Sequence, residues 1–517
     1  MYHRWIIITA TVFTLLVVAT ADNYSQRPVG TPSPTVNPCP YPLTEANRPV
    51  APASASNEVA AFIDPTAEVS SENLVRVSKH VYIAPFARLE AQSARHGICI
   101  EEGSNVQDNT LLKANGGPVV VGEHAIIAHG AEMIGHGTSV SIAHHNACSL
   151  PAPGRDPNTW ATPAERGRQA LANALAEAHV LHPDCKKIPA FIGFNALNQS
   201  HIEDGALLST ASRLVRGVIL RAGYTSYVGK SLDTQAEADT ACGDPTQCEV
   251  RYVTAGDLLF MEAVLEVNEC LAKGYTMQYR DTARLVHPFG GPESIYGIGI
   301  DPGSYHRCEF NNDSERPTIG YPFTWDLNIR DINRAVADPN PSKKIRIIGD
   351  VRMVDIEKIQ DNVSIRADEG EPMTFRAGIE FGFANTFHAL EITAEDPVRE
   401  VRVGSNPEGV PPALSPPSSG VKFEERVVVH GGGRRIRAGG ADPEPTNIER
   451  FVYVGKESVV FRAHLAEGTR VGTKAVLAGY DNGCDLDGNC TPGEVIPDRC
   501  VKFDNTPANQ CAYLREW

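Results

Sequence analysis

A spacing of six residues between apolar side chains is the feature that most constrains how this chain can fold. Small residues often follow the apolar position, as in Val121-Gly122 and Ile127-Ala128. Neither an α-helix nor a simple alternating strand has this period. It predicts a parallel β-helix with three short faces per coil, in which one apolar residue per face points to the axis. Chance spacing in an ordinary β-domain is the alternative, and three separate runs in phase disfavour it. These runs are Val77, Ile83 and Leu89; Ile100, Val106 and Leu112; and Val121, Ile127 and Met133.

Interruptions of this period divide the chain into two modules. A capping box, Thr162-Pro163-Ala164-Glu165, predicts a helix inside an insertion in the first module. Apolar residues three and four positions apart predict a second helix at Asp257–Lys273, which should pack along the outside of the coils. The expected segments are a signal peptide at 1–21, a Pro- and Ser-rich arm at 22–58, module one at 59–275 with its insertion at 137–189, an irregular connection at 276–342, module two at 343–480 and a Cys-rich tail at 481–517.

The N-terminus and the cysteine content predict export to a secreted, periplasmic or lumenal location. A short basic region, His3-Arg4, precedes the apolar stretch Trp5–Val18, and small residues follow as a cleavage site. An uncleaved N-terminal anchor is the alternative, and no other membrane segment is expected. The 12 cysteines suit disulfide bonds in an oxidising compartment. A net charge of −16 argues against nucleic acid and anionic membrane surfaces as partners.

Short motifs in both modules resemble those of the gamma-class carbonic anhydrases. In module one, Ser104-Asn105-Val106-Gln107-Asp108 resembles the Asn-x-Gln-Asp motif of that family, and Ile127-Ala128-His129 resembles the approach to its second metal histidine. In module two, Ile365–Gly370 resembles its Arg-x-Asp-Glu motif, and His388-Ala389-Leu390-Glu391 resembles its first metal histidine with a nearby acid. The resemblance in module one covers about residues 62–275 and includes Asn268 in the expected second helix.

This resemblance implies a left-handed parallel β-helix, mainly β with packing α-helices, that hydrates CO2 reversibly to bicarbonate. In the family, three histidines hold Zn or Fe between neighbouring coil stacks of a trimer, and water bound there becomes the nucleophile. The glutamine positions that water with support from the asparagine, an Arg–Asp pair braces the interface, and two glutamates relay protons. The implied metal ligands are His129, His136, His388 and His464. The implied catalytic residues are Asn105, Gln107, Asp108, Asn268, Arg366, Asp368, Glu369 and Glu391.

Neither module alone carries the complete pattern. In module one, Lys113 and Ile134 stand where the first and third histidines belong, although a two-residue bulge would bring in His136. In module two, the Asn, Gln and Asp positions hold Glu380, Gly382 and Phe383. Each module keeps motif residues that the other lacks. We therefore expect a composite site between modules, in a homo-oligomer or a pseudo-trimeric assembly. The alternatives are an inactive structural or assembly protein of the same descent and, third, a hexapeptide-repeat acyltransferase.

Overall fold

The computed structural model describes most of residues 61–280 and 345–517. The undescribed positions inside these ranges are 65, 71–73, 94–95, 137–139, 143–149, 179–187, 350, 354–355, 368–372, 390–400, 406–418, 432–445 and 483–490. The predicted signal peptide and N-terminal arm lie outside the described residues, as does nearly all of the predicted connection.

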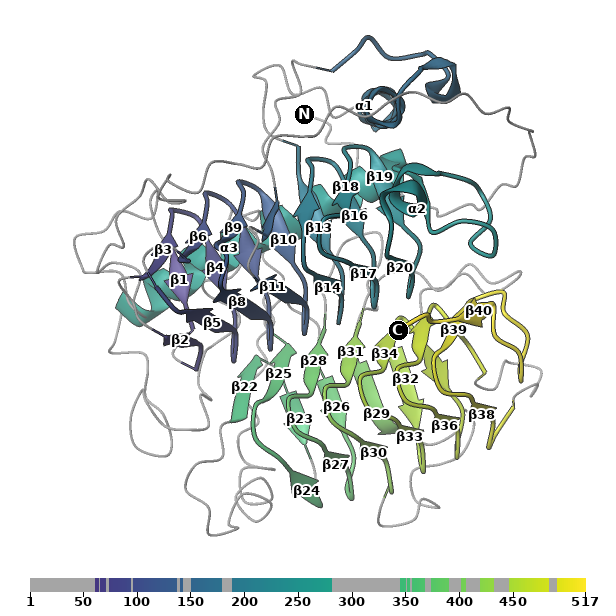
Figure 1. The fold of residues 1–517 in the computed structure, drawn as a ribbon. Helices are drawn as coiled ribbons and strands as arrows, with labels where there is room; N and C mark the ends of the chain where they lie inside the picture. Colours follow the sequence, from purple (N-terminus) through teal and green to yellow (C-terminus); the bar gives the residue numbers. More distant parts are fainter. Residues whose placement is uncertain are drawn as a thin grey trace, which may run out of the picture.

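The first module is a parallel β-helix, in which the strands of successive coils stack into three sheets (Figure 1). The sheets are named here after one strand each. The β7 sheet contains β1 (Phe62–Ile63), β4 (Tyr82–Ile83), β7 (Asn105–Val106), β10 (Ala125–Ile127), β13 (Ala190–Ile192), β16 (Leu207–Leu208), β19 (Tyr224–Ser226) and β21 (Val250–Tyr252). The β8 sheet contains β2 (Glu68–Ser70), β5 (Arg88–Ala91), β8 (Leu111–Asn115), β11 (Glu132–His136), β14 (Leu197–Asn198), β17 (Arg213–Leu214) and β20 (Ser231–Leu232). The β9 sheet contains β3 (Val75–Val77), β6 (Ile98–Ile100), β9 (Val119–Val121), β12 (Val140–Ile142), β15 (His201–Ile202) and β18 (Ile219–Leu220).

The second module repeats this architecture beside the first. The β28 sheet contains β22 (Ile345–Gly349), β25 (Val363–Ala367), β28 (Thr386–His388), β31 (Val428–His430), β34 (Val459–Phe461), β37 (Val476–Ala478), β39 (Cys500–Phe503) and β40 (Tyr513–Leu514). The β29 sheet contains β23 (Val351–Met353), β26 (Met373–Phe375), β29 (Val401–Ser405), β32 (Thr446–Glu449) and β35 (His464–Leu465). The β27 sheet contains β24 (Lys358–Ile359), β27 (Glu380–Phe381), β30 (Lys422–Phe423), β33 (Tyr453–Val454), β36 (Arg470–Val471) and β38 (Val495–Ile496).

The six-residue period is confirmed by the core of each module. Val106, Leu112 and Val121 are fully buried on the axis of the first module, as the period predicts. The axis of the second module also holds phenylalanines, and the rings of Phe381 and Phe387 meet edge to face at 5.2 Å. Burial of this continuous apolar column is the main stabilising contribution, because each short strand buries little on its own.

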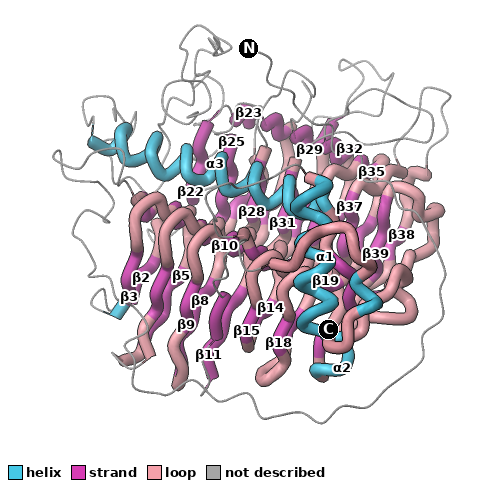
Figure 2. The backbone as a smooth tube through the Cα atoms, turned by 90° about the horizontal axis from the view of Figure 1, so that it is seen from above, coloured by secondary structure: helices cyan, strands magenta, loops and turns pink. Residues whose placement is uncertain are grey.

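Helices cover the outside of the first module. The predicted capping box is present, since Thr162 and Glu165 exchange side-chain and backbone hydrogen bonds at the start of α1 (Pro163–Glu177). The second predicted helix is α3 (Ala255–Arg280), which packs across β1, β4 and β10 and extends into the predicted connection (Figure 2). The short helices η5 (Pro157–Thr159) and α2 (Gln235–Asp239) complete the set of described helices. No described helix has the length and apolar character needed to cross a membrane.

The predicted Cys-rich tail differs from expectation, because much of it belongs to the second module. Strands β38, β39 and β40 extend the sheets of that module beyond residue 480. Disulfide bonds link Cys242 with Cys248 and Cys500 with Cys511. Two further tail cysteines, Cys484 and Cys490, lie outside the described residues.

Candidate metal centre

Turns of the first module meet the outer face of the β28 sheet of the second. The Asn109 amide, in the turn after β7, donates a 2.9 Å hydrogen bond to the Thr386 hydroxyl on β28. One coil further, Arg426 forms an ion pair with Glu132. The Asn195 amide, in the turn after β13, donates to the Arg426 carbonyl at 3.3 Å. The two modules are therefore aligned coil by coil along their shared interface.

Three buried histidines converge at this interface. His129 lies in the turn after β10 of the first module, while His388 and His430 end two neighbouring strands of the second. His388 Nδ1 lies 3.2 Å from His129 Nε2 and 3.2 Å from His430 Nε2. The three candidate ligand atoms all lie within 4.8 Å of one another. Within the described part of the chain, this is the one cluster of His, Cys, Asp and Glu side chains that could hold a metal ion.

Strand register explains why two of these histidines are neighbours. His388 pairs with His430 in the parallel ladder, and Arg366 pairs with His388 on the other side. Since successive side chains of a strand point to opposite faces, Phe387 and Val429 fill the core while the histidine after each faces outward. The sequences Thr386-Phe387-His388 and Val428-Val429-His430 thus place two imidazoles one above the other.

The position of His129 depends on the glycine that follows it. Gly130 adopts a left-handed backbone conformation with φ of 69°, and a Cβ at this residue would collide with Oδ1 of Asn195. The Gly130 N–H donates to the Asp108 carbonyl at 2.8 Å, and the Asn195 N–H donates to the His129 carbonyl at 3.0 Å. The turn is thereby fixed from the coils on both sides.

Oxygen acceptors fix which nitrogen of two imidazoles faces the cluster. Nδ1 of His129 lies 3.0 Å from Oδ2 of Asp108, and Nδ1 of His430 lies 2.7 Å from the Gly431 carbonyl oxygen. A carboxylate and a carbonyl oxygen can only accept a hydrogen bond, so the proton of each ring is assigned to Nδ1, which leaves the lone pair of Nε2 toward the cluster. Outer partners of this kind commonly orient histidines that bind metals.

Asp108 connects the two modules beneath the cluster. Its Oδ2 lies 2.8 Å from an Arg366 guanidinium nitrogen, and the Ser364 hydroxyl donates to its Oδ1. Burial alone would raise the pKa of Asp108, but Arg366, together with His129 and Ser364, holds this pKa well below its ordinary value. Arg366 also lies over the Tyr82 ring at 5.3 Å. An ionised carboxylate from module one is therefore braced by two residues of module two.

Two imidazoles of the cluster, those of His129 and His430, have lowered pKa values and pack against an aromatic ring. Burial lowers the pKa of His129 to about 4, although the neighbouring Asp108 opposes the shift. Burial also lowers the pKa of His430 well below its ordinary value, with His388 and His129 adding to the effect. Phe194 stacks on His129 at 5.6 Å between ring centres and lies 5.0 Å from the His430 ring. Neutral imidazoles behind an aromatic wall are suited to metal ligation.

The metal-free protein should lose stability as the pH falls from about 6.5 to about 4. In this range the unfolded chain binds protons at two histidines that stay neutral in the folded state. For His129 alone, the lowered pKa corresponds to about 3 kcal/mol. Asp108 remains ionised throughout this pH range, so its contribution to the free energy of unfolding is lost only at lower pH. Urea unfolding of metal-free protein at several pH values measures this slope, and a His129→Gln variant should flatten it. A slope that His129→Gln leaves unchanged would contradict the assignment.

Two of the three nitrogen–nitrogen separations in the cluster match those around one metal ion. A tetrahedral ion with metal–nitrogen bonds of 2.0–2.1 Å separates its ligand nitrogens by about 3.3 Å. His388 Nδ1 lies 3.2 Å from each of the other two nitrogens, and all three nitrogens lie within 4.8 Å of one another. Three imidazoles suit Zn or Fe and do not suit the oxygen-seeking ions Mg and Ca.

The structure brings together only part of the predicted ligand set. His129 and His388 meet as the composite-site hypothesis requires, but their third partner is His430. His136 instead lies at the end of β11, 3.3 Å from the Asn115 amide. His464 lies on the β29 sheet with Nε2 2.9 Å from Glu449. The expectation that His136 or His464 joins this centre is therefore wrong.

The sequence alone did not identify His430 as a ligand, because long insertions separate its coil from that of His388. The 42-residue separation hides the six-residue period, and a glycine- and arginine-rich run follows His430 directly. The available signal was the repeated strand pattern of two non-charged residues followed by histidine, seen at Thr386–His388 and Val428–His430.

The predicted catalytic residues are partly placed. Asn105 on β7 and Gln107 directly after it are buried, and neither atom of the Asn105 amide has a hydrogen-bond partner within the described residues. Asn268 on α3 donates to the Val264 carbonyl at 2.7 Å. Arg366 forms an ion pair with Asp108 of the first module, whereas Asp368, the partner that the motif implies, lies outside the described residues. The acids Asp368, Glu369 and Glu391 lie outside the described residues.

Comparison with known proteins adds little to this description. No family model matches the sequence, and no curated protein matches it either. A solved structure described as a hexapeptide transferase family protein from Anaplasma phagocytophilum is similar, with 19% identity over 41% of this chain and 91% of that chain and a TM-score of 0.24. A likeness this distant carries no argument about activity. The strand topology establishes the fold: the described chain is mainly β and forms two parallel β-helix modules, each with three sheets.

Proposed function

We propose that this chain is an exported, metal-dependent carbonic anhydrase of the gamma-class type, which hydrates CO2 reversibly to bicarbonate. The observation that carries the proposal is the convergence of three buried histidine nitrogens from both modules within 4.8 Å of one another, two of the separations being 3.2 Å. A divalent cation held by these three imidazoles would lower the pKa of a bound water molecule to about 7 and would so supply a nucleophile for CO2.

The residues around the cluster would hold and shape this centre. Asp108 and the Gly431 carbonyl orient the imidazoles of His129 and His430 toward the ion. Phe194 and Phe461 form an apolar wall against the imidazole rings, which excludes bulk water and suits a small apolar substrate. The buried Asn105 amide, which has no hydrogen-bond partner among the described residues, is suited to a polar guest such as water or a product oxygen.

The proposed stoichiometry is one centre per chain. In the first module, Glu90, Lys113 and Ile134 are successive partners across the β8 sheet, just as Arg366, His388 and His430 are across the β28 sheet. Lys113 forms a 2.8 Å ion pair with Glu90 where the second module has arginine and histidine. The first module thus contributes one ligand to the centre and has no second set of its own at these positions.

Metal analysis and CO2 hydration test the proposal together. The protein, purified anaerobically and supplied with Zn or Fe, should retain about one equivalent of metal per chain and should hydrate CO2 in a stopped-flow pH-indicator assay. Well under one equivalent, or hydration no faster than in buffer, would favour the structural or assembly alternative. No observation among the described residues favours the acyltransferase alternative. Export, and association into a homo-oligomer or a pseudo-trimer, remain part of the proposal.

A further inference from the structure

Two backbone ladders run along the interface between the modules. In each ladder, the N–H of a turn residue donates to a carbonyl in the turn of the coil before it. In the first-module ladder, the N–H groups of Gly130, Asn195, Ala211 and Gly229 donate to the carbonyl oxygens of Asp108, His129, Phe194 and Thr210, respectively, at 2.7–3.0 Å. In the second-module ladder, the N–H groups of Arg426, Glu457, Lys474 and Arg499 donate to the carbonyl oxygens of Phe383, Glu425, Lys456 and Thr473, respectively, at 2.7–2.9 Å. The first ladder contains His129 itself.

Consecutive residues after β40 join the ends of both ladders. The Arg515 N–H donates to the carbonyl of Arg499, the last turn residue of the second-module ladder, at 2.6 Å. The Glu516 N–H donates to the carbonyl of Gly229, the last turn residue of the first-module ladder, at 3.0 Å. One peptide bond therefore spans the interface and fixes the offset between the two coil stacks.

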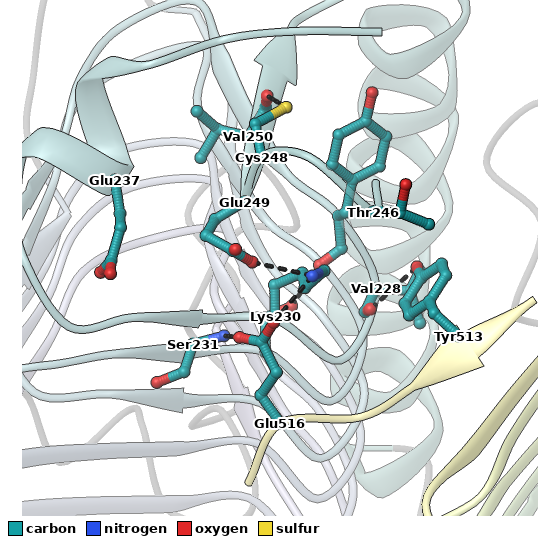
Figure 3. Close-up of polar contacts among 12 residues, drawn as sticks. Val228, Lys230, Ser231, Glu237, Thr246, Cys248, Glu249, Val250, Tyr513 and Glu516 are labelled. Atoms are coloured by element: carbon teal, nitrogen blue, oxygen red, sulfur yellow. Dashed lines mark hydrogen bonds and ion pairs between the residues drawn. The ribbon is translucent and has the colours of Figure 1, made fainter. Parts of the chain in front are cut away.

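Side chains reinforce this connection. The Glu516 carboxylate accepts from buried Lys230 at 2.7 Å and from the Ser231 N–H at 2.9 Å, while Lys230 also lies 3.1 Å from Glu249 (Figure 3). The Tyr513 hydroxyl donates to the Val228 carbonyl at 3.0 Å in the same view. A charged hydrogen bond to a buried lysine contributes more than an exposed ion pair would.

A short path leads from these residues to the histidine cluster. The Trp517 indole N–H donates to the Ala211 carbonyl at 2.7 Å, and the Ala211 N–H donates to the Phe194 carbonyl at 2.7 Å. The Phe194 ring in turn stacks on His129 and contacts His430. The indole ring also lies 5.5 Å from the Lys474 ammonium of the second module.

We propose that Arg515, Glu516 and Trp517 are positioning residues, which align the modules so that His129 meets His388 and His430. The expected effect on metal binding rests on the proposed metal centre. A shift of one coil stack along the other would separate the single histidine ligand of module one from the two histidine ligands of module two. The backbone N–H groups of residues 515 and 516 remain when side chains are substituted. Removing the side chains of Glu516 and Trp517 therefore tests whether their hydrogen bonds to the first module hold this backbone in place.

The test uses full-length protein with the double substitution Glu516→Ala and Trp517→Ala. Co2+ affinity, followed by the visible absorption of the bound ion, should fall roughly 10-fold or more, as for loss of outer partners of a metal site. Hydrogen exchange should become faster in peptides that contain Asn109, Asn195 or Thr386, and should stay unchanged in β9 and β12. The conservative variant Glu516→Gln with Trp517 intact should restore most of the affinity. Leu514→Ala is the matched control, because that side chain is 57% exposed.

The two readouts separate the two proposals. Unchanged interface exchange in the double variant would overturn the positioning role, whatever the metal affinity. Faster exchange throughout the chain, including β9 and β12, would also overturn it, because the effect would then be general unfolding. If the unsubstituted protein takes up no Co2+, the metal centre fails, while faster exchange confined to the interface would still support the alignment role.

Discussion

His430→Ala should abolish stoichiometric metal binding and, with it, CO2 hydration. This substitution removes one of three nitrogens that converge within 4.8 Å, and no other described His, Cys, Asp or Glu stands close enough to replace it. The loss of affinity should exceed the roughly 10–100-fold that removal of an outer partner costs. Metal content after dialysis, and competition with a chelator of known affinity, measure the effect.

His136→Ala is the control for this substitution. His136 belongs to the ligand set that the resemblance implies, but it lies on β11 beside Asn115 and outside the cluster. Metal affinity and hydration rate should therefore remain within about twofold of the unsubstituted protein, as is usual for residues with no contact to a site. If His136→Ala removed the metal and His430→Ala did not, the composite centre would be misplaced.

Arg366→Met should destabilise the protein by about 3–5 kcal/mol, the usual cost of breaking a buried ion pair. Arg366 and Asp108 are almost completely buried and lie 2.8 Å apart across the interface. Without the guanidinium, the Asp108 carboxylate stays buried with weaker partners, and its hold on His129 weakens. Urea unfolding of the metal-free protein at pH 7 measures the loss, and the Co2+ affinity of the variant should fall as well.

Lys113→Met provides the control, because Lys113 forms an ion pair with Glu90 on neighbouring strands of the first module, away from the interface residues Arg366 and Asp108. Both side chains of that pair are about one-third exposed, so its loss should cost at most about 1 kcal/mol. Equal effects of the two substitutions would show that the Arg366–Asp108 pair has no special role at the interface.

The fold was largely predictable because each coil repeats one physical requirement. Each face of a coil needs a buried apolar residue. The spacing of residues such as Val106, Leu112 and Val121 therefore predicts the β-helix without knowledge of contacts between distant parts of the chain. The α1 capping box was equally local, since Thr162 and Glu165 are three residues apart. The extent of the second module was less predictable, because loops separate β37 from β39 and hide the continuation of the period.

The candidate site was only half predictable, because it depends on contacts between residues far apart in the chain. The motif context identified His129, His388, Asp108 and Arg366, and it indicated that the modules had to share a centre. It could not identify His430, whose role follows from its register opposite His388 across an insertion of unpredictable length. The resemblance also implied His464 as a ligand, but its strand β35 belongs to the β29 sheet and not to the β28 sheet that holds His388 and His430.

The central claim is that one ion binds between the modules at His129, His388 and His430. Anomalous diffraction at the Zn or Fe absorption edge, on crystals of the metal-loaded protein, tests it most directly. A single strong anomalous peak per chain is expected about 2.0–2.1 Å from the Nε2 atoms of His129 and His430 and from Nδ1 of His388. A fully loaded crystal with its peak elsewhere, or with no peak between these three side chains, would contradict the account.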